Sequence, residues 1–536
     1  MKHLSNLRRG VILVALWPLF VALAVDASVQ IQIGNNFSGS DNSSTQITPA
    51  DANGAIGPKH LVQFINGAVA IYNKTNGTRV LQITDLQFWA NAGVIISSDA
   101  TISDPRIIFD PVSQRWFVSE IDLNANASDP TIYANNFLIA VSDTDDPTRS
   151  WHGKSFLADP DTGYFADFPT LGVDSKAVYL SGDMFADGNT PIGPSLWSIP
   201  KSDLLINQTP AVVSNATWFG VMSYSDRGDV LQPAACFDGS STGDILAARS
   251  LLQPDDTLIA SKVLDGDTTN AALAPAVPIQ VPDYTFPIDA EQPDGTATLD
   301  DNDSRLSARV YTVGGIMYAV QNVQIGSHAA IQWYRISATN DSLIESGAIT
   351  NADMDLFFPS IAVTANGVIV IACNGSGLNT PISVFAFAGQ TVEGLTTFGD
   401  PILLKAGTVP NYHDDLELSG QSADSRWGDY STTSLDPIDP SRFWTIQMLP
   451  RDSGTWITQI TEMLVLPQLT ITMSDTNVNL SWPLFGAKYQ LQTADGLSPT
   501  NSWSFVPQTP STNGDQISVV LPAGANQQFF RLVEQP

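Results

Sequence analysis

Short apolar segments bounded by polar turns fill most of the chain, and their spacing is that of β-strands. Residues 61–65, 137–141 and 316–320 are typical, because each is apolar over most of its length and is flanked by Asp, Asn or Gly. No window holds apolar residues at i, i+3, i+4 and i+7 for three turns, so long amphipathic helices are not expected. The pattern predicts an all-β protein.

Two pairs of segments repeat within the chain and predict how the strands are grouped. Residues 168–180 match residues 358–370 without a gap, and both segments begin with Phe-Pro. Residues 110–117 resemble residues 436–444 with one residue inserted. A strand, a polar turn and a second strand recur in each pair, as in one blade of a β-propeller. We therefore predict a β-propeller over residues 50–466, with a pair of β-sandwiches as the alternative.

The number of blades follows from counting such units, and the count is seven, with six or eight also allowed. The units lie near residues 55–95, 102–157, 163–205, 215–290, 305–350, 355–405 and 425–465. After residue 466 the strands alternate apolar and polar residues more regularly. This change predicts a separate small antiparallel β-sandwich over residues 467–536.

The N-terminus has the pattern of a secretory signal. Basic residues precede an apolar run over residues 11–25, which ends in Val25-Asp26-Ala27 with small side chains where a signal peptidase reads. The run is shorter than the roughly 20 residues of a bilayer span, although an uncleaved anchor is the alternative. We expect a signal peptide at residues 1–27, a leader segment at 28–49 and no later membrane span. The protein is then secreted, and extracellular or associated with the cell surface.

The charge excludes one class of partner. The sequence has 24 Lys and Arg against 54 Asp and Glu, which gives a formal net charge of −30. A field of that sign repels polyanions, so nucleic acid is not expected as a partner. Hydrophobic residues make up 43% of the chain, enough to bury a large core and to argue against disorder. We expect a monomer.

The two cysteines, Cys236 and Cys373, could form one long-range disulfide in an oxidising compartment. Cys373 directly follows the apolar run 368–372, which favours two buried thiols over a pair. The sequence leaves the pairing open.

Several segments together resemble a family of uncharacterised secreted bacterial propeller proteins. They include Gly57-Pro58-Lys59-His60, Asp104-Pro105-Arg106, Asp167-Phe168-Pro169 and Arg426-Trp427-Gly428-Asp429-Tyr430. The resemblance covers nearly all of residues 50–465 and implies a sialidase-like or BNR-like propeller, with no established activity to carry over. Residues 467–536 resemble a C-terminal module common on secreted proteins of verrucomicrobial and planctomycete bacteria.

The candidate ligand site consists of two of these segments, Asp104-Pro105-Arg106 and Arg426-Trp427-Gly428-Asp429-Tyr430, which place charged residues beside aromatic ones. At the start of an innermost strand they would lie at the mouth of the central channel. Paired hydrogen bonds from their aspartates could then orient the two arginines toward a hydroxyl-rich or anionic ligand. The alternative is a set of buried ion pairs that join neighbouring blades. The candidate ligand-binding residues are Asp104, Arg106, Arg426, Trp427, Asp429 and Tyr430.

Three acidic turns offer the hard oxygen ligands that Ca²⁺ prefers, and they raise the hypothesis of a structural calcium ion. The densest is Asp300-Asp301-Asn302-Asp303, and the candidate metal ligands are Asp300, Asp301 and Asp303. None of the turns matches a full EF-hand loop, so solvated turns are the alternative.

The residues favour a binding protein over an enzyme. A sialidase needs an arginine cluster, and five arginines are available for one, but a blade arginine also braces loop carboxylates. These are Arg106, Arg305, Arg309, Arg335 and Arg426. No Gly-x-Ser-x-Gly elbow occurs, and no catalytic residue is assigned. The leading interpretation is a secreted propeller that binds or scaffolds a carbohydrate or cell-surface ligand; the alternative is a sialidase-like glycoside hydrolase or lyase on the same propeller.

Overall fold

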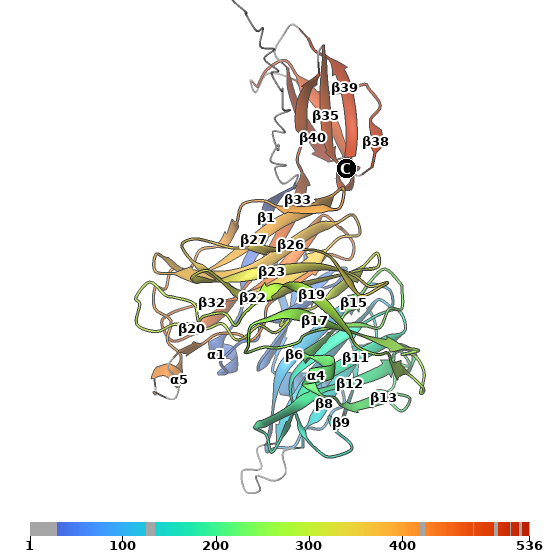
Figure 1. Cartoon of the computed structure of the whole chain (residues 1–536), viewed down its shortest axis with the longest axis vertical. Coiled ribbons are helices and arrows are strands. Elements are labelled where there is room, and N and C mark those ends of the chain that lie inside the picture. The colour runs from blue at the N-terminus through green and yellow to red at the C-terminus, as the bar shows by residue number, and fades with distance from the viewer. Residues whose placement is uncertain are drawn as a thin grey trace, which may run out of the picture.

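In the computed structural model the chain forms a β-propeller followed by a small β-sandwich (Figure 1). The structure describes residues 29–124, 134–418, 420, 424–474, 476–497, 502–514, 516–524 and 528–534. The predicted signal peptide at 1–27 therefore lies outside the described residues. The all-β prediction is confirmed, and the short helices lie in connections. They are α1 (Asn42–Thr45), α2 (Asp85–Asn91), α3 (Lys201–Leu204), α4 (Tyr224–Arg227), α5 (Asp415–Leu418) and the 3₁₀ turn η1 (Leu484–Gly486).

The first three blades are four-stranded and antiparallel, with the strands in chain order from the inside outward. Blade one contains β2 (Asn53–Ile56), β3 (His60–Ile65), β4 (Ala68–Asn73) and β5 (Arg79–Ile83). Blade two contains β6 (Ala100–Asp110), β7 (Arg115–Asn124), β8 (Asn136–Ser142) and β9 (Trp151–Leu157). Blade three contains β10 (Phe165–Val173), β11 (Ala177–Ala186), β12 (Thr190–Pro200) and β13 (Thr217–Val221).

Blades four and six carry extra short strands, whereas blade five between them has four strands. Blade four contains β14 (Asp229–Pro233), β16 (Asp244–Ala248), β17 (Asp255–Leu264), β18 (Ala272–Leu273) and β19 (Val277–Tyr284). Blade five contains β21 (Tyr311–Val313), β22 (Ile316–Ile325), β23 (His328–Ser337) and β24 (Ser342–Ile349). Blade six contains β25 (Asp355–Val363), β26 (Val368–Gly377), β27 (Thr380–Val392), β28 (Leu395–Phe398) and β29 (Ile402–Lys405). The short strand β15 (Ala235–Cys236) pairs in parallel with β10 and β21 and so links blades three and five in one sheet.

Blade seven closes the ring with strands from both ends of the propeller. It contains β31 (Thr432–Leu435), β32 (Arg442–Pro450), β33 (Trp456–Pro467) and, as its outer strand, β1 (Val29–Asp41). β1 pairs with β33 in antiparallel register from Val29 opposite Pro467 to Asp41 opposite Ile457. Part of the segment expected as a leader at 28–49 thus forms β1, whose hydrogen bonds cover the edge of β33 that would otherwise be exposed.

The internal repeats mark equivalent places in different blades. Residues 168–180 run from β10 into β11, and residues 358–370 run from β25 into β26. The other pair forms the turn between the two inner strands in blades two and seven. Both faces of a blade are covered by its neighbours, which is why β26 is buried along its whole length and begins with a continuous apolar run over residues 368–373. The free thiol of Cys373 is buried in β26, and that of Cys236 is buried in β15.

The C-terminal module packs two antiparallel sheets around a small core of its own. One sheet contains β34 (Thr470–Ser474), β35 (Asn477–Pro483), β39 (Gln516–Pro522) and β38 (Ser511–Asn513); the other contains β37 (Ser504–Phe505), β36 (Tyr489–Ala494) and β40 (Phe529–Glu534). Leu480, Trp482 and Val519 are central to its core. Lys488 Nζ contacts Ser441 Oγ of the propeller at 3.0 Å, and Phe485 packs against the propeller core.

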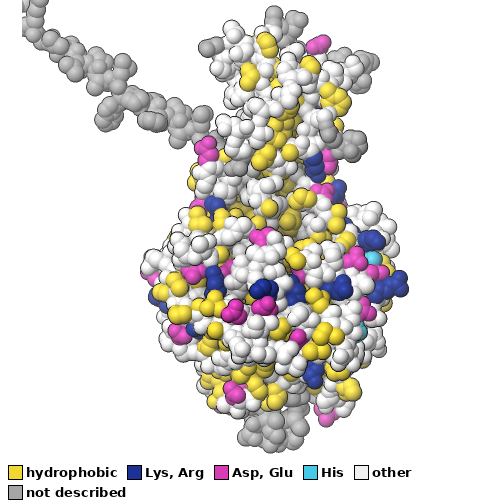
Figure 2. Space-filling view, turned by 90° about the vertical axis from the view of Figure 1, so that its right-hand side faces the viewer, with side chains coloured by type: hydrophobic (Ala, Val, Ile, Leu, Met, Phe, Trp, Pro, Cys, Tyr) yellow, Lys and Arg dark blue, Asp and Glu magenta, His cyan; other side chains and the backbone are white. Residues whose placement is uncertain are grey.

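The C-terminal module lies on the face of the propeller where the inner strands end. The inner strands start at the opposite face. Blade seven shows why: β31 leaves the starting face, β32 returns to it, and β33 leaves it again and ends at Pro467, next to the module. The view in Figure 2 shows charged side chains mostly on the propeller and few on the module. Within the described part of the chain, no helix is both long and apolar enough to cross a membrane.

Candidate functional site at the mouth of the central channel

The inner strands of several blades share one backbone distortion at the start of the channel. In β6, β10, β14 and β25 the pairing register shifts across four consecutive residues, as in a β-bulge. The second of the four residues has a left-handed conformation that side chains rarely adopt. These residues are Asp104 (φ 63°), Phe168 (φ 47°), Val230 (φ 51°) and Phe358 (φ 46°). Such strained positions cluster at functional sites, so this end of the channel is the place to look for one.

Aspartates from six blades gather at this mouth, each in the first half of an inner strand or in the segment before it. They are Asp51, Asp104, Asp167, Asp229, Asp303 and Asp429. Blade six has the apolar Phe357 instead. The carboxylates are close enough to perturb one another, since Asp167 and Asp429 both act on the carboxyl of Asp104. They form one acidic ring, which we call the mouth ring.

Two arginines are held in the mouth ring by carboxylates. Arg305 forms a two-point pair with Asp303, with Nε to Oδ1 at 2.8 Å and Nη2 to Oδ2 at 2.7 Å. Arg426 lies between Asp300, which it contacts at 2.9 Å, and Asp429. The side chains of Arg305 and Arg426 are 18% and 27% exposed, so both keep an edge toward solvent. The structure thus places the Arg426–Asp429 pair as the sequence analysis expected.

The expected pair of Asp104 with Arg106 does not form. Arg106 is 5% exposed, and its guanidinium carbon lies 3.4 Å from the ring centre of Tyr430 and 5.0 Å from that of Phe168. Asp104 accepts a hydrogen bond from Ser103 Oγ at 2.7 Å instead. Arg106 therefore lies one layer below the mouth ring, in the wall of the channel.

The two predicted aromatic residues are buried and offer no surface to a ligand. Trp427 is 0% exposed, packs edge-on against Tyr412 and donates to Asn374 Oδ1 at 3.2 Å. Tyr430 is 2% exposed and donates its hydroxyl hydrogen to the carbonyl oxygen of Pro105 at 3.2 Å. Both belong to the packing between blades.

Burial and mutual repulsion raise the pKa of several carboxyls at the mouth. Burial, with Asp167 and Asp429 nearby, raises the pKa of Asp104 to about 7. Burial next to Asp183 and Asp303 raises the pKa of Asp229 to about 7. Burial also raises the pKa of Asp183, on β11, to about 6. Desolvation penalises the charged form in each case, so part of the ring holds protons near neutral pH.

The predicted metal ligands point to different partners. Asp300 is bound to Arg426 and Asp303 is bound to Arg305, while Asp301 is buried at 1% exposed. In the described ranges no three His, Cys, Asp or Glu side chains converge as a metal site would require. The turn at 300–303 serves the mouth ring, and its acidity alone does not argue for calcium.

Several members of the mouth ring were not predicted from the sequence. Asp51, Asp167 and Asp229 were not proposed as ligand contacts, although each lies at or directly before a left-handed residue near the start of an inner strand. Such an aspartate at the start of blade after blade is a signal that a blade-by-blade comparison could have found. Asp183 carries no such signal, because it reaches the site from a second strand.

Comparison with known proteins finds only distant likenesses to solved structures. No protein-family model and no curated protein matches the chain. Similar solved structures include a Penicillium chrysogenum α-L-arabinanase complexed with arabinobiose (TM-score 0.39, 9% identity, 81% of this chain and 98% of that chain covered). A Trypanosoma rangeli sialidase in complex with sialic acid has a TM-score of 0.34 at 9% identity, covering 87% of this chain and 86% of that one. A Dyadobacter fermentans protein of unknown function has a TM-score of 0.37 at 10% identity, with 70% and 98% covered.

These likenesses carry no argument about a ligand or a reaction. The chain folds as a β-propeller. The narrower family resemblance and the relationship of the C-terminal module stay predictions.

Proposed function

We propose that this protein is exported and binds a hydroxyl-rich ligand, a carbohydrate in the first instance, at the mouth ring. The observation that carries the proposal is the pair of arginines, Arg305 and Arg426, held by carboxylates at partly exposed positions in different segments of the ring. A fixed guanidinium beside a carboxylate presents donors and acceptors side by side, which suits neighbouring hydroxyl groups. Because carboxylates already hold these two arginine side chains in place, little conformational entropy is lost when a ligand binds to them.

The charge balance at the mouth favours a neutral ligand over an anionic one. The aspartates of the ring outnumber Arg305 and Arg426, and the whole chain has a formal net charge of −30. An acidic polysaccharide would meet repulsion from both. Export rests on the N-terminal signal pattern in residues 1–27.

A glycan array with the purified chain, followed by calorimetry on any sugar retained, tests the proposal. Arg426→Ala and Arg305→Ala should each weaken binding about tenfold or more, which corresponds to roughly 1.4 kcal/mol, a usual value for a charge-assisted hydrogen bond. Arg442→Ala is the matched control. Arg442 also bridges two carboxylates, Asp439 and Glu462, but it lies at the opposite end of blade seven. Equal losses in all three variants, or no retained glycan, would contradict the proposal.

A hydrolase on the same mouth is the second candidate, and Asp229 is the observation that favours it. Its carboxyl is partly exposed, and its pKa of about 7 suits a general acid near neutral pH. Hydrolysis of chromogenic glycosides by the wild type that is lost in Asp229→Asn would establish this function. Binding without turnover would leave the binding protein as the better description.

A further inference from the structure

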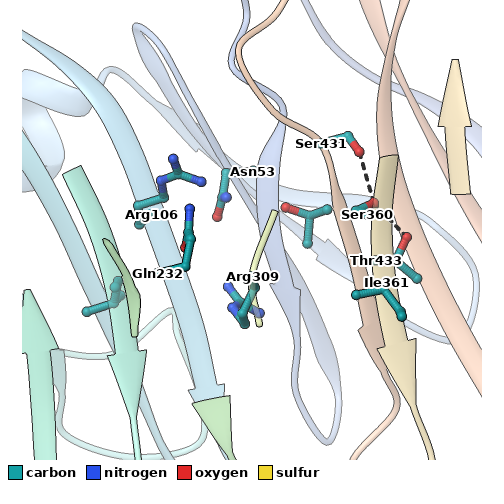
Figure 3. A pocket seen from close by; sticks show the side chains of 10 residues that line it. Asn53, Arg106, Gln232, Arg309, Ser360, Ile361, Ser431 and Thr433 are labelled. Carbon is teal, nitrogen blue, oxygen red and sulfur yellow. Dashed lines mark hydrogen bonds between the residues drawn. The ribbon is translucent and has the colours of Figure 1, made fainter. Parts of the chain in front are cut away.

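Below the mouth ring the channel narrows to a small polar cavity that contains two arginine side chains. It is lined by residues from most of the blades: Asn53, Arg106, Leu171, Gln232, Arg309, Ser360, Ile361, Ser431, Thr432 and Thr433. Figure 3 shows the two arginines on one side, with Asn53 and Gln232 near them, and the hydroxyls of Ser431, Ser360 and Thr433 on the other. The hydroxyl side is internally satisfied, with contacts of 2.9 Å and 2.8 Å along that row.

Arg106, which lines this cavity, has an unused donor. Its Nε donates to the carbonyl oxygen of Pro169 at 2.8 Å, and its Nη1 donates to that of Ser307 at 3.3 Å. Its Nη2 is buried and has no hydrogen-bond partner. A buried guanidinium nitrogen without an acceptor is costly, because it has given up water and gained nothing in exchange.

Arg309 and Asn53 add further donors. Arg309 donates Nη2 to the carbonyl oxygen of Ile107 at 2.6 Å and Nη1 to the hydroxyl of Tyr311 at 3.3 Å. Asn53 uses its Oδ1 to accept from the backbone N–H of Ile107 at 3.0 Å, which leaves its NH₂ group for the channel. The cavity is therefore lined by free donor groups of both residue types, the Arg106 Nη2 and the Asn53 NH₂ group.

Neither arginine is neutralised by a direct partner. Within the described ranges, no carboxylate oxygen lies within 4.0 Å of a guanidinium nitrogen of Arg106 or Arg309. The carboxyls that act on Arg106 from a greater distance are those of Asp104 and Asp51. Burial raises the pKa of both, so near neutral pH they offset its charge only in part. Two guanidinium groups without a carboxylate partner in direct contact therefore line one small cavity.

The size of the cavity limits what can supply the missing negative charge. The space open to the centres of water molecules is about 20 Å³, which is room for on the order of one or two water-sized particles. That space suits a monatomic ion and is tight for a phosphate or a sugar acid. We propose that the cavity is a binding site for one halide ion, chloride under ordinary conditions, held between Arg106 and Arg309. This site does not rest on the ligand proposed for the mouth ring.

The first test is the melting temperature (Tm) of the purified full chain in sodium chloride against sodium gluconate at equal ionic strength. Chloride that binds the native state alone stabilises it by mass action, so Tm should rise with chloride and then saturate. Arg309→Met removes one guanidinium at a partly exposed position and should abolish the saturable rise. Arg442→Met, which removes an arginine far from the channel, should keep it.

The second test is anomalous diffraction from crystals grown or soaked in sodium bromide. An anomalous peak in hydrogen-bond contact with Arg106 Nη2, absent from Arg309→Met crystals, is the expected result. A cavity without such a peak in wild-type crystals overturns the proposal, since water then fills the space. A chloride effect on Tm that is equally large in Arg309→Met also overturns it.

Discussion

The raised pKa of Asp104 makes the stability of the propeller depend on pH in a direction that can be calculated. In the unfolded chain an aspartate ionises near pH 3.9, whereas burial and the neighbouring carboxylates raise the pKa of Asp104 to about 7. The stabilisation that protonated Asp104 gives the folded state is complete below the pKa of an aspartate in the unfolded chain. It is lost as the pH rises through about 7. Each pKa unit corresponds to about 1.4 kcal/mol, so this one group should lower the free energy of unfolding by about 2–3 kcal/mol between pH 5 and pH 8.

Asp104→Asn tests this value with little other change. Asn has the shape of a protonated Asp, tolerates the left-handed backbone at this position and can still accept from Ser103. Between pH 5 and pH 8 the free energy of unfolding of the variant should fall by about 2–3 kcal/mol less than that of the wild type, because the amide of Asn does not ionise. Urea denaturation followed by tryptophan fluorescence at pH 5, 6, 7 and 8 measures the difference through the shift in midpoint.

The control is Asp452→Asn, at an exposed turn where hydrogen bonds from the backbone of Gly454 and from Thr455 lower the carboxyl pKa. The stabilisation from ionised Asp452 is lost only below the pKa of an aspartate in the unfolded chain. The free energy of unfolding of this control should therefore change with pH as that of the wild type does from pH 5 to pH 8. If Asp104→Asn shows the same drop in stability as the wild type, the mouth ring does not hold its proton on Asp104 and the reasoning is refuted.

Three further predictions concern other parts of the molecule. A chain that starts at residue 46 should fail to give a soluble folded propeller, because without β1 the edge of β33 is open; solubility and circular dichroism report this. Lys201→Met should lower the free energy of unfolding by roughly 3–5 kcal/mol, since Lys201 and Asp110 form a buried pair at 2.8 Å. Lys176→Met, which breaks an exposed pair, should cost under about 1 kcal/mol in the same denaturation assay. The calcium prediction is checked by melting in millimolar Ca²⁺ and in EDTA, where an unchanged Tm would remove it.

The fold was predictable because a blade is a local unit. A strand, a turn and the next strand lie within about 15 residues of sequence, so the matching segments at 168–180 and 358–370 can be recognised from the order of the residues alone. β1 was not predictable in this way, since its partner β33 lies more than 400 residues further along the chain. Nothing in residues 29–41 says which edge they will cover.

The candidate site was predictable in position and only partly in detail. The start of an inner strand lies at the channel mouth in any propeller, so Arg426 and Asp429 were expected there. The partner of Arg106 depends on packing between blades two, three and seven, which brings Tyr430 and Phe168 onto its guanidinium. Neighbours in sequence suggested Asp104 as its partner, and tertiary contacts decided otherwise.

The left-handed residues of the inner strands connect the mouth ring to the cavity beneath it. In four inner strands, the residue two positions after the left-handed one is polar and lines the cavity. Asn53 follows Asp51 in this way and Arg106 follows Asp104, while Gln232 follows Val230 and Ser360 follows Phe358. A regular strand would turn alternate side chains to the same face, whereas a bulge re-aims the residues that follow it. The strain of a left-handed side chain, on the order of 1–3 kcal/mol each, would be removed by glycine if only the turn mattered. That the chain keeps Asp, Val and Phe at these positions indicates that their side chains are also used, the aspartates in the mouth ring and Phe358 in the core beneath it.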